Sequence, residues 1–139
     1  LDMAYAAIQL QGVDGATITG NLVVETWQQG IQVGPLMKNV LVKGNTIDQA
    51  NTKGDLDKGG IRLYAGSTSE NITVENNLVT NSGSAVALRS MTGDVPANLV
   101  VRYNSLDASN ANAGLYSGWQ SPGSIDATDN WWGSVDGPD

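Results

Sequence analysis

Apolar residues alternate with polar residues along most of the chain, in a unit that recurs around a single asparagine. In each unit an apolar residue lies five and three positions before the asparagine and two positions after it. Alternation with a period of two places successive side chains on opposite faces of a strand, so the unit predicts short β-strands and no helix. The asparagines on which the units align are Asn21, Asn45, Asn77, Asn104 and Asn130.

A further apolar segment precedes each asparagine unit. It has the form small-apolar-x-apolar, which predicts a third short strand in every unit. The spacing between successive asparagines varies from 24 to 32 residues, as it does when loops of different length separate the strands of a repeat. We therefore expect five repeats of three short strands. The preceding segments are residues 7–10, 30–33, 60–63, 85–88 and, more weakly, 114–117.

Strands this short cannot bury an apolar face on their own. Stacking one repeat on the next aligns their inward residues in columns and makes a continuous interior. The expected fold is therefore all-β: a parallel β-helix, or solenoid, of about five coils that forms a single domain over residues 1–139. An asparagine tolerates a left-handed bend, and its amide can reach the asparagine one coil away, about 4.8 Å distant. The five asparagines are thus expected to form a hydrogen-bonded ladder.

The repeated apolar-x-apolar-x-x-Asn-x-apolar unit resembles the right-handed parallel β-helix repeat of the pectate-lyase-like superfamily, from about Ala7 to Gly133. Residues 126–134 and the following Asp136-Gly137-Pro138 are similar to the closing coil of many secreted bacterial β-helix domains. Such domains are commonly parts of larger surface proteins, polysaccharide-active enzymes or adhesins. The resemblance implies the carboxyl-terminal end of such a domain, excised from or processed out of a larger bacterial protein and located outside the cell or on its surface.

Charge and composition narrow the range of functions. Fourteen Asp and Glu against seven Lys and Arg give a net charge of −7, which repels a phosphate backbone and an anionic bilayer. Without Cys and His, the chain cannot form a thiolate nucleophile, a Ser-His-Asp relay, a disulfide or a His/Cys zinc site. Its apolar runs are far shorter than the ~20 residues of a spanning helix. We therefore expect neither a nucleic-acid partner nor membrane insertion.

The outward positions of the preceding segments correspond to the usual groove of the family that the chain resembles. Two arginines and two tyrosines lie on or directly after the last three of these segments, and Trp27 and Trp119 lie in flanking loops. A guanidinium can hold a sugar carboxylate through two hydrogen bonds, and aromatic rings offer stacking faces, so this face suits an acidic polysaccharide. A solvated sheet face without a ligand is the alternative. The expected ligand-binding residues are Arg62, Tyr64, Arg89, Tyr116 and Trp119.

Enzymatic alternatives differ in the groups that they need. Glycoside hydrolysis requires two carboxylates about 5–9.5 Å apart. The outward positions on and directly after the preceding segments carry no carboxylate. A polysaccharide lyase or epimerase needs a cation on the sugar carboxylate, as Arg62 or Arg89 could provide, and a base near the sugar C5, as Lys58 or Tyr64 could provide. Family enzymes usually have more coils and a capped amino-terminal end. A non-catalytic module is therefore the first hypothesis, with a calcium-assisted lyase or epimerase fragment as the alternative.

The longest insertion, residues 48–59, carries Asp55 and Asp57 and leads into the strand that holds Arg62. Two carboxylates on one loop can supply oxygens to Ca²⁺, which takes six to eight oxygen ligands. The alternative is an acidic loop that faces solvent. Calcium at Asp55 and Asp57 is the one cofactor hypothesis that the sequence supports.

The two ends of the solenoid are expected to differ. At the carboxyl end, Trp132 should point inward and close the last coil while Trp131 points outward. At the amino end no helix is expected to cover the strand edges and apolar side chains around Ile8, Ile18 and Val23. Such an edge invites pairing. Self-association through this open end leads to a third hypothesis, a structural subunit of a fibre, an adhesin or a surface layer.

Overall fold

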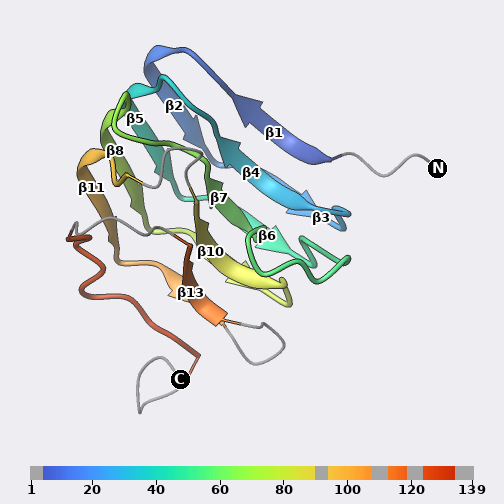
Figure 1. Cartoon of the computed structure of the whole chain (residues 1–139). Helices are drawn as coiled ribbons and strands as arrows, with labels where there is room; N and C mark the ends of the chain where they lie inside the picture. Colours follow the sequence, from blue (N-terminus) through green and yellow to red (C-terminus); the bar gives the residue numbers. More distant parts are fainter. Residues whose placement is uncertain (1–4, 90–93, 108–112, 119–123, 134–139) are drawn as a thin grey trace.

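The computed structural model describes residues 5–89, 94–107, 113–118 and 124–133. These residues form a parallel β-solenoid of about four turns, and their elements are strands and loops without a helix. Figure 1 shows the coils stacked one on another from β1 at the amino end toward β13. The all-β solenoid expected from the apolar pattern is confirmed.

Three parallel sheets form the walls of the solenoid. Each of the first four coils contributes one strand to each sheet, and strands of successive coils pair in parallel. Sheet A consists of β1 (Ala6–Leu10), β4 (Gln29–Val33), β7 (Ile61–Leu63), β10 (Ser84–Leu88) and β13 (Ala113–Ser117). Sheet B consists of β2 (Asp14–Thr19), β5 (Lys38–Lys43), β8 (Glu70–Glu75) and β11 (Ala97–Arg102). Sheet C consists of β3 (Leu22–Val24), β6 (Thr46–Asp48), β9 (Leu78–Thr80) and β12 (Ser105–Leu106).

The strand register aligns the inward side chains in continuous columns, as the apolar pattern predicts. In the middle coils these side chains are fully buried, and the stacked aliphatic rows together form one buried cluster. Sheet A carries two such rows: Ile8, Ile31, Ile61, Val86 and Leu115, and Leu10, Val33, Leu63 and Leu88. Sheet B also carries two rows: Ala16, Val40, Ile72 and Leu99, and Ile18, Val42, Val74 and Val101. The row in sheet C is Val23, Ile47, Val79 and Leu106.

The fifth coil is less regular than the sequence pattern suggests. Among the described residues, sheet A has a fifth strand, whereas in sheets B and C the fifth coil contributes the single bridges Val100–Asp126 and Ser105–Trp131. The inward residues Leu115, Ile125 and Trp132 of this coil are also less buried than those of the middle coils. The described part of the chain therefore forms about four turns and part of a further one.

The asparagine ladder is confirmed along its whole length. At each step the Nδ2 of one asparagine donates to the Oδ1 of the next, at 2.9–3.0 Å. The same Oδ1 also accepts the backbone N–H of the preceding ladder asparagine, at 3.0–3.1 Å. The three middle members, Asn45, Asn77 and Asn104, are 1–2% exposed. The ladder therefore supplies buried partners for polar groups at the corner between sheets B and C.

The ladder asparagines do not themselves take the left-handed bend that an asparagine tolerates. The residue before it has the positive φ, between 53° and 66°, in every coil. The bend at this preceding residue turns the chain, while the asparagine directs its amide into the interior. Glycine or asparagine takes that position at low steric cost in three coils. The left-handed residues are Gly20, Gly44, Asn76, Tyr103 and Asp129.

A second ladder, which we did not predict, runs along the outside of the opposite corner of sheet B. Asn98 Nδ2 donates to Asn71 Oδ1 at 2.8 Å, Asn71 to Asn39 at 2.9 Å, and Asn39 to Asp14 Oδ1 at 2.7 Å. All three asparagines are left-handed, with φ between 52° and 55°. Each stands six residues before an inner ladder asparagine, so the same repeat alignment contained the signal.

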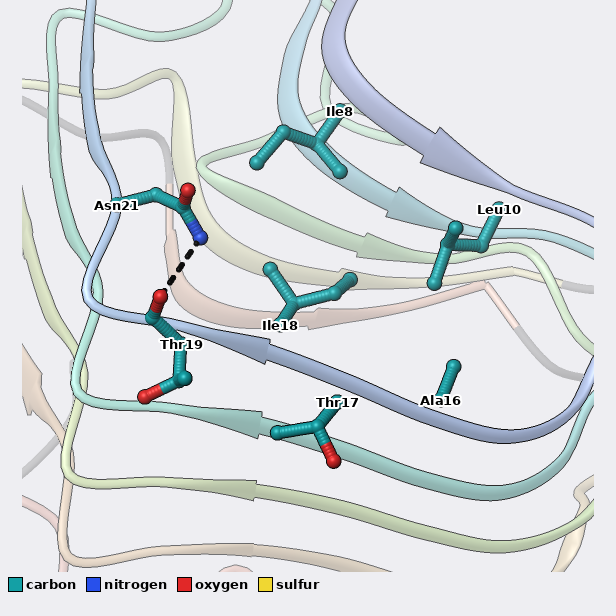
Figure 2. Close-up of a pocket in the computed structure, with 7 residues that line it drawn as sticks. All are labelled: Ile8, Leu10, Ala16, Thr17, Ile18, Thr19 and Asn21. Atoms are coloured by element: carbon teal, nitrogen blue, oxygen red, sulfur yellow. Dashed lines mark hydrogen bonds between the residues drawn. The ribbon is translucent and has the colours of Figure 1, made fainter.

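The two ends of the solenoid differ as expected. Trp132 packs against the core at the carboxyl end, whereas Trp131 is 50% exposed. At the amino end a hollow of about 480 Å³ opens between sheets A and B (Figure 2). Ile18 and Val23 are nevertheless buried, with 6% and 5% exposure. The residues that line the hollow are Ile8, Leu10, Ala16, Thr17, Ile18, Thr19 and Asn21.

Candidate functional site

The outer face of sheet A brings the predicted ligand-binding residues onto adjacent coils. The register places Arg62 between Gln32 and Ala87, with Tyr116 one strand beyond Ala87. Backbone bonds from Tyr64 N–H to Val33 O and from Arg89 N–H to Leu63 O continue the pairing past the strand ends. Tyr64 and Arg89 therefore lie in neighbouring coils, as the repeat predicts. Trp119 lies outside the described residues.

The insertion between β6 and β7 folds into a closed loop beside these strands. Asn51, which is 2% exposed and left-handed, organises it: its Nδ2 donates to the carbonyl oxygens of Asp55 and Lys58, at 2.7 and 2.8 Å. Its Oδ1 accepts the Asp55 N–H at 3.2 Å. Ser84 of β10 donates its hydroxyl to the carbonyl oxygen of Leu56 at 3.1 Å. The insertion is thus fixed to sheet A across two coils.

This loop places Asp57 between the two arginines. Asp57 Oδ2 accepts hydrogen bonds from Arg62 Nη2 at 3.1 Å and from Arg89 Nη1 at 2.7 Å. The carbonyl oxygen of Asp57 also accepts from Arg62 Nε at 2.9 Å. Sequence reasoning missed this contact because it treated Asp57 as a calcium ligand or a solvated residue. The two guanidinium groups converge on one carboxylate oxygen, so this position of sheet A holds an anionic group by charge-assisted hydrogen bonds.

Arg62 is more enclosed than an ordinary outward residue of a sheet. Its side chain is 11% exposed, and its guanidinium lies 4.4 Å from the centre of the Tyr64 ring. Burial lowers the pKa of Arg62, while the nearby Asp57 carboxylate raises it. The guanidinium nevertheless keeps its charge at any physiological pH. Arg89 differs in being 51% exposed.

A chain of buried amides extends from Arg62 toward the amino end of sheet A. Arg62 Nη1 donates to Gln32 Oε1 at 3.0 Å, and Gln29 Nε2 donates to the same oxygen at 2.8 Å. Gln29 and Gln32 are 3% and 6% exposed. The outward column is therefore not the solvated face that one alternative assumed at this point. Gln29 Oε1 has no hydrogen-bond partner among the described residues.

The hypothetical calcium ligands point to different partners. Asp55 Oδ2 accepts from Lys58 Nζ at 2.9 Å and lies 3.2 Å from Lys53 Nζ, and its hydrogen bonds to these lysines lower the pKa of Asp55. Asp57 is held by the two arginines. In the described ranges, no cluster of three or more His, Cys, Asp or Glu could hold a metal ion. Calcium binding at Asp55 and Asp57 stays a prediction, and the ion would have to displace these four cations.

A pair of aromatic rings lies near the amino end. The rings of Tyr5 and Trp27 meet edge to face with centroids 5.7 Å apart, and Lys53 Nζ lies 5.3 Å from the centre of the Trp27 ring. Trp27 was noted in the sequence as a flanking aromatic residue, but its pairing with Tyr5 was not foreseen. Tyr5 is 64% exposed.

Comparisons with known proteins bear on the fold. Searches of curated proteins and of solved structures each found no significant match. In the part of the chain that the structure describes, no helix is long and apolar enough to cross a membrane. The family model described as "Right handed beta helix region" matches residues 2–130. With its parallel coils and buried columns, the chain therefore belongs to the right-handed β-helix family.

Proposed function

We propose that this chain is a non-catalytic, extracellular β-helix module that binds acidic polysaccharide on the outer face of sheet A. In this proposal Arg62 and Arg89 hold a sugar carboxylate, and Tyr64 and Tyr116 provide aromatic surfaces beside it. The observation that carries the proposal is the convergence of both guanidinium groups on Asp57 Oδ2, at 3.1 and 2.7 Å. It supports the proposal because a carboxylate fits between these two arginines.

Electrostatics favour a local site of this kind. The chain has a net charge of −7, so an anionic ligand is repelled at long range and needs a cationic position to bind. Arg89 has half of its side chain exposed, which leaves part of the guanidinium accessible to a ligand. Hydrogen bonds between a guanidinium and a carboxylate are among the strong ones in proteins. Arg89 is therefore the first contact that an approaching uronate would make.

Binding without turnover is favoured by the state of the two candidate bases. Lys58 is 16% exposed, and its ammonium is hydrogen-bonded to Asp55. The ring of Tyr64 lies against the guanidinium of Arg62. A lyase or epimerase would need one of these groups free to take a proton from the sugar C5. Incubation with polyuronates, followed by ultraviolet detection of unsaturated products, tests the enzymatic alternative directly.

The binding experiment uses oligogalacturonate titrated into the protein and followed by calorimetry at low ionic strength. Arg89→Ala is expected to weaken binding at least about ten-fold, because it removes a charge-assisted hydrogen bond. Arg102→Ala is the matched control. Arg102 has a comparable exposure of 42%, but it lies on sheet B, so its removal changes the net charge equally without touching the site.

The result expected is a loss of affinity for Arg89→Ala and unchanged affinity for Arg102→Ala. Equal weakening of binding by both variants would mean that only net charge matters, and the assignment of the binding site to the outer face of sheet A would be wrong. Binding to neutral oligosaccharides alone would also contradict the proposal. Release of unsaturated products by the wild-type chain would replace it with the lyase alternative.

A further inference from the structure

We infer that Asp57 is a built-in competitor for the carboxylate site: it occupies the position between Arg62 and Arg89 that an acidic sugar would take, and it must leave before the sugar can engage both arginines. This inference rests on the proposed function and deepens it. It assigns to the insertion between β6 and β7 a role in setting the affinity of the site.

The contacts of Asp57 are those of a bound anion. One carboxylate oxygen accepts from both guanidinium groups, and the Asp57 carbonyl oxygen accepts from Arg62 Nε. With Asp57 in place, Arg62 is 11% exposed and Arg89 is 51% exposed. A ligand can therefore reach Arg89 directly, whereas full contact with Arg62 requires the carboxylate of Asp57 to move aside.

The loop can release Asp57 without losing its fold, because its main anchors lie elsewhere. Asn51 holds the carbonyl oxygens of Asp55 and Lys58, and Ser84 holds that of Leu56. None of these bonds involves the side chain of Asp57. A change of rotamer at this residue would therefore free the guanidinium groups while the rest of the insertion stays on sheet A.

An internal carboxylate has two effects on binding. Because it is tethered, its effective concentration at the site is high, so it competes with any external uronate. It also keeps the two arginines close together, because its negative charge offsets the repulsion between the two guanidinium groups. The charge of Arg89 lowers the pKa of Arg62, and the charge of Asp57 raises it. The site is thus preorganised for a carboxylate and, at the same time, partly blocked by one.

The test compares Asp57→Asn with Asp55→Asn, using oligogalacturonate as the probe. Both variants lie in the same loop and remove one negative charge, but Asp55 faces Lys53 and Lys58 rather than the arginines. Asp57→Asn is expected to bind oligogalacturonate at least about ten-fold more tightly than the wild type, because the neutral amide competes poorly for the guanidinium groups. Asp55→Asn is expected to bind like the wild type.

Three other outcomes would each overturn the inference, and they differ in whether the proposed function survives. If the wild type binds and Asp57→Asn binds equally or more weakly, the competitor role is wrong and the proposed function survives. If both variants bind oligogalacturonate more tightly by the same factor, the change in net charge alone explains the result and the competitor role is wrong. If no variant binds, and the wild type does not either, the proposed function itself fails.

A measurement on the wild type guards against a folding defect in the variant. The side-chain carboxyl carbons of Asp57 and Asp55 can be followed by nuclear magnetic resonance as oligogalacturonate is added. The Asp57 signal is expected to shift in proportion to saturation, with the Asp55 signal unchanged. A stationary Asp57 signal at saturation would show that the carboxylate stays on the arginines, and it would overturn the inference.

Discussion

Single asparagine side chains determine how the corners of this solenoid are built. The amide of Asn77 donates to Asn104 Oδ1 and to the carbonyl oxygens of Val42 and Glu75, and its own Oδ1 accepts two bonds from Asn45. Buried polar groups of the backbone are costly when they lack partners. Each of the three middle ladder asparagines therefore provides partners for polar groups in its own coil and in both neighbouring coils.

Replacing Asn77 by Ala should reveal this role. The variant leaves the carbonyl oxygen of Val42 and the amide of Asn45 without their partner in a buried corner, so we expect a loss of about 1–3 kcal/mol in the free energy of unfolding. Urea denaturation followed by circular dichroism measures it. Asn98→Gly, in the exposed outer ladder, is the control: glycine keeps the left-handed backbone of this position, so only an exposed amide is lost and the cost should be less than about 0.5 kcal/mol. A larger loss for Asn98→Gly than for Asn77→Ala would contradict the inner ladder as a source of stability.

At the scale of elements, charges of alternating sign link the strands of sheet B. Glu75 of β8 lies between two cations. Its Oε1 is 2.9 Å from Lys43 Nζ of β5, and its Oε2 is 3.6 Å from Arg102 Nε of β11. Each of these three residues stands two positions before a ladder asparagine, so together they form a cation-anion-cation column. The hydrogen bond between Lys43 and Glu75 lowers the pKa of Glu75 from the ordinary 4.5. The column adds to the pairing of three consecutive strands, for which cross-strand charge pairs are worth about 0.2–1 kcal/mol each.

The lowered pKa of Glu75 makes stability depend on pH in a defined direction. The unfolded chain binds a proton on this residue at a higher pH than the folded chain does, so protonation favours unfolding. The contribution of Glu75 is complete above its ordinary value of 4.5 and is lost as the pH falls through the lowered value. We expect the free energy of unfolding of the wild type to fall more steeply than that of Glu75→Gln between about pH 5 and about pH 3. Parallel curves in urea denaturation would contradict this.

The candidate site shows which elements a repeat pattern can predict. Arg62 and Tyr116 fall on outward positions of strands, and Tyr64 and Arg89 directly follow β7 and β10, so counting from the repeat places all four on one face. The contact of Asp57 with the two arginines could not be found in this way. The insertion that carries it has no repeat, and its path depends on Asn51 and on a hydroxyl from β10, which is distant in sequence.

At the scale of the whole molecule, the amino end of the described part of the chain carries open strand edges. Among the described residues, β1, β2 and β3 pair on one side, with β4, β5 and β6. Figure 2 shows Ile8, Leu10 and Ile18 around the hollow beside these strands. Open strand edges next to apolar side chains favour pairing with another chain. Self-association through this end stays a prediction.

Gel filtration coupled to light scattering, at increasing protein concentration, tests whether the chain self-associates through its amino end. The wild-type chain is expected to form species heavier than its 14.5 kDa monomer. Leu10→Glu places a carboxylate in the hollow and should shift the chain toward the monomer, because an unpaired charge is costly to bury. Leu22→Glu, at a position 73% exposed on the outer face of sheet C, is the control. A wild-type chain that is monomeric at every concentration would rule out association through this end.

The sequence by itself determined the solenoid, the inward columns and the inner ladder. These features repeat from coil to coil, and the two-residue period of a strand converts position in the repeat directly into a place in the fold. The tertiary structure alone decided the features that depend on contacts outside the repeat. It placed the left-handed bend one residue before each ladder asparagine, limited the described part of the fifth coil to one strand and two single bridges, and brought Asp57 onto Arg62 and Arg89. The physical reason is that a loop is positioned by the particular partners it meets, which no local pattern specifies.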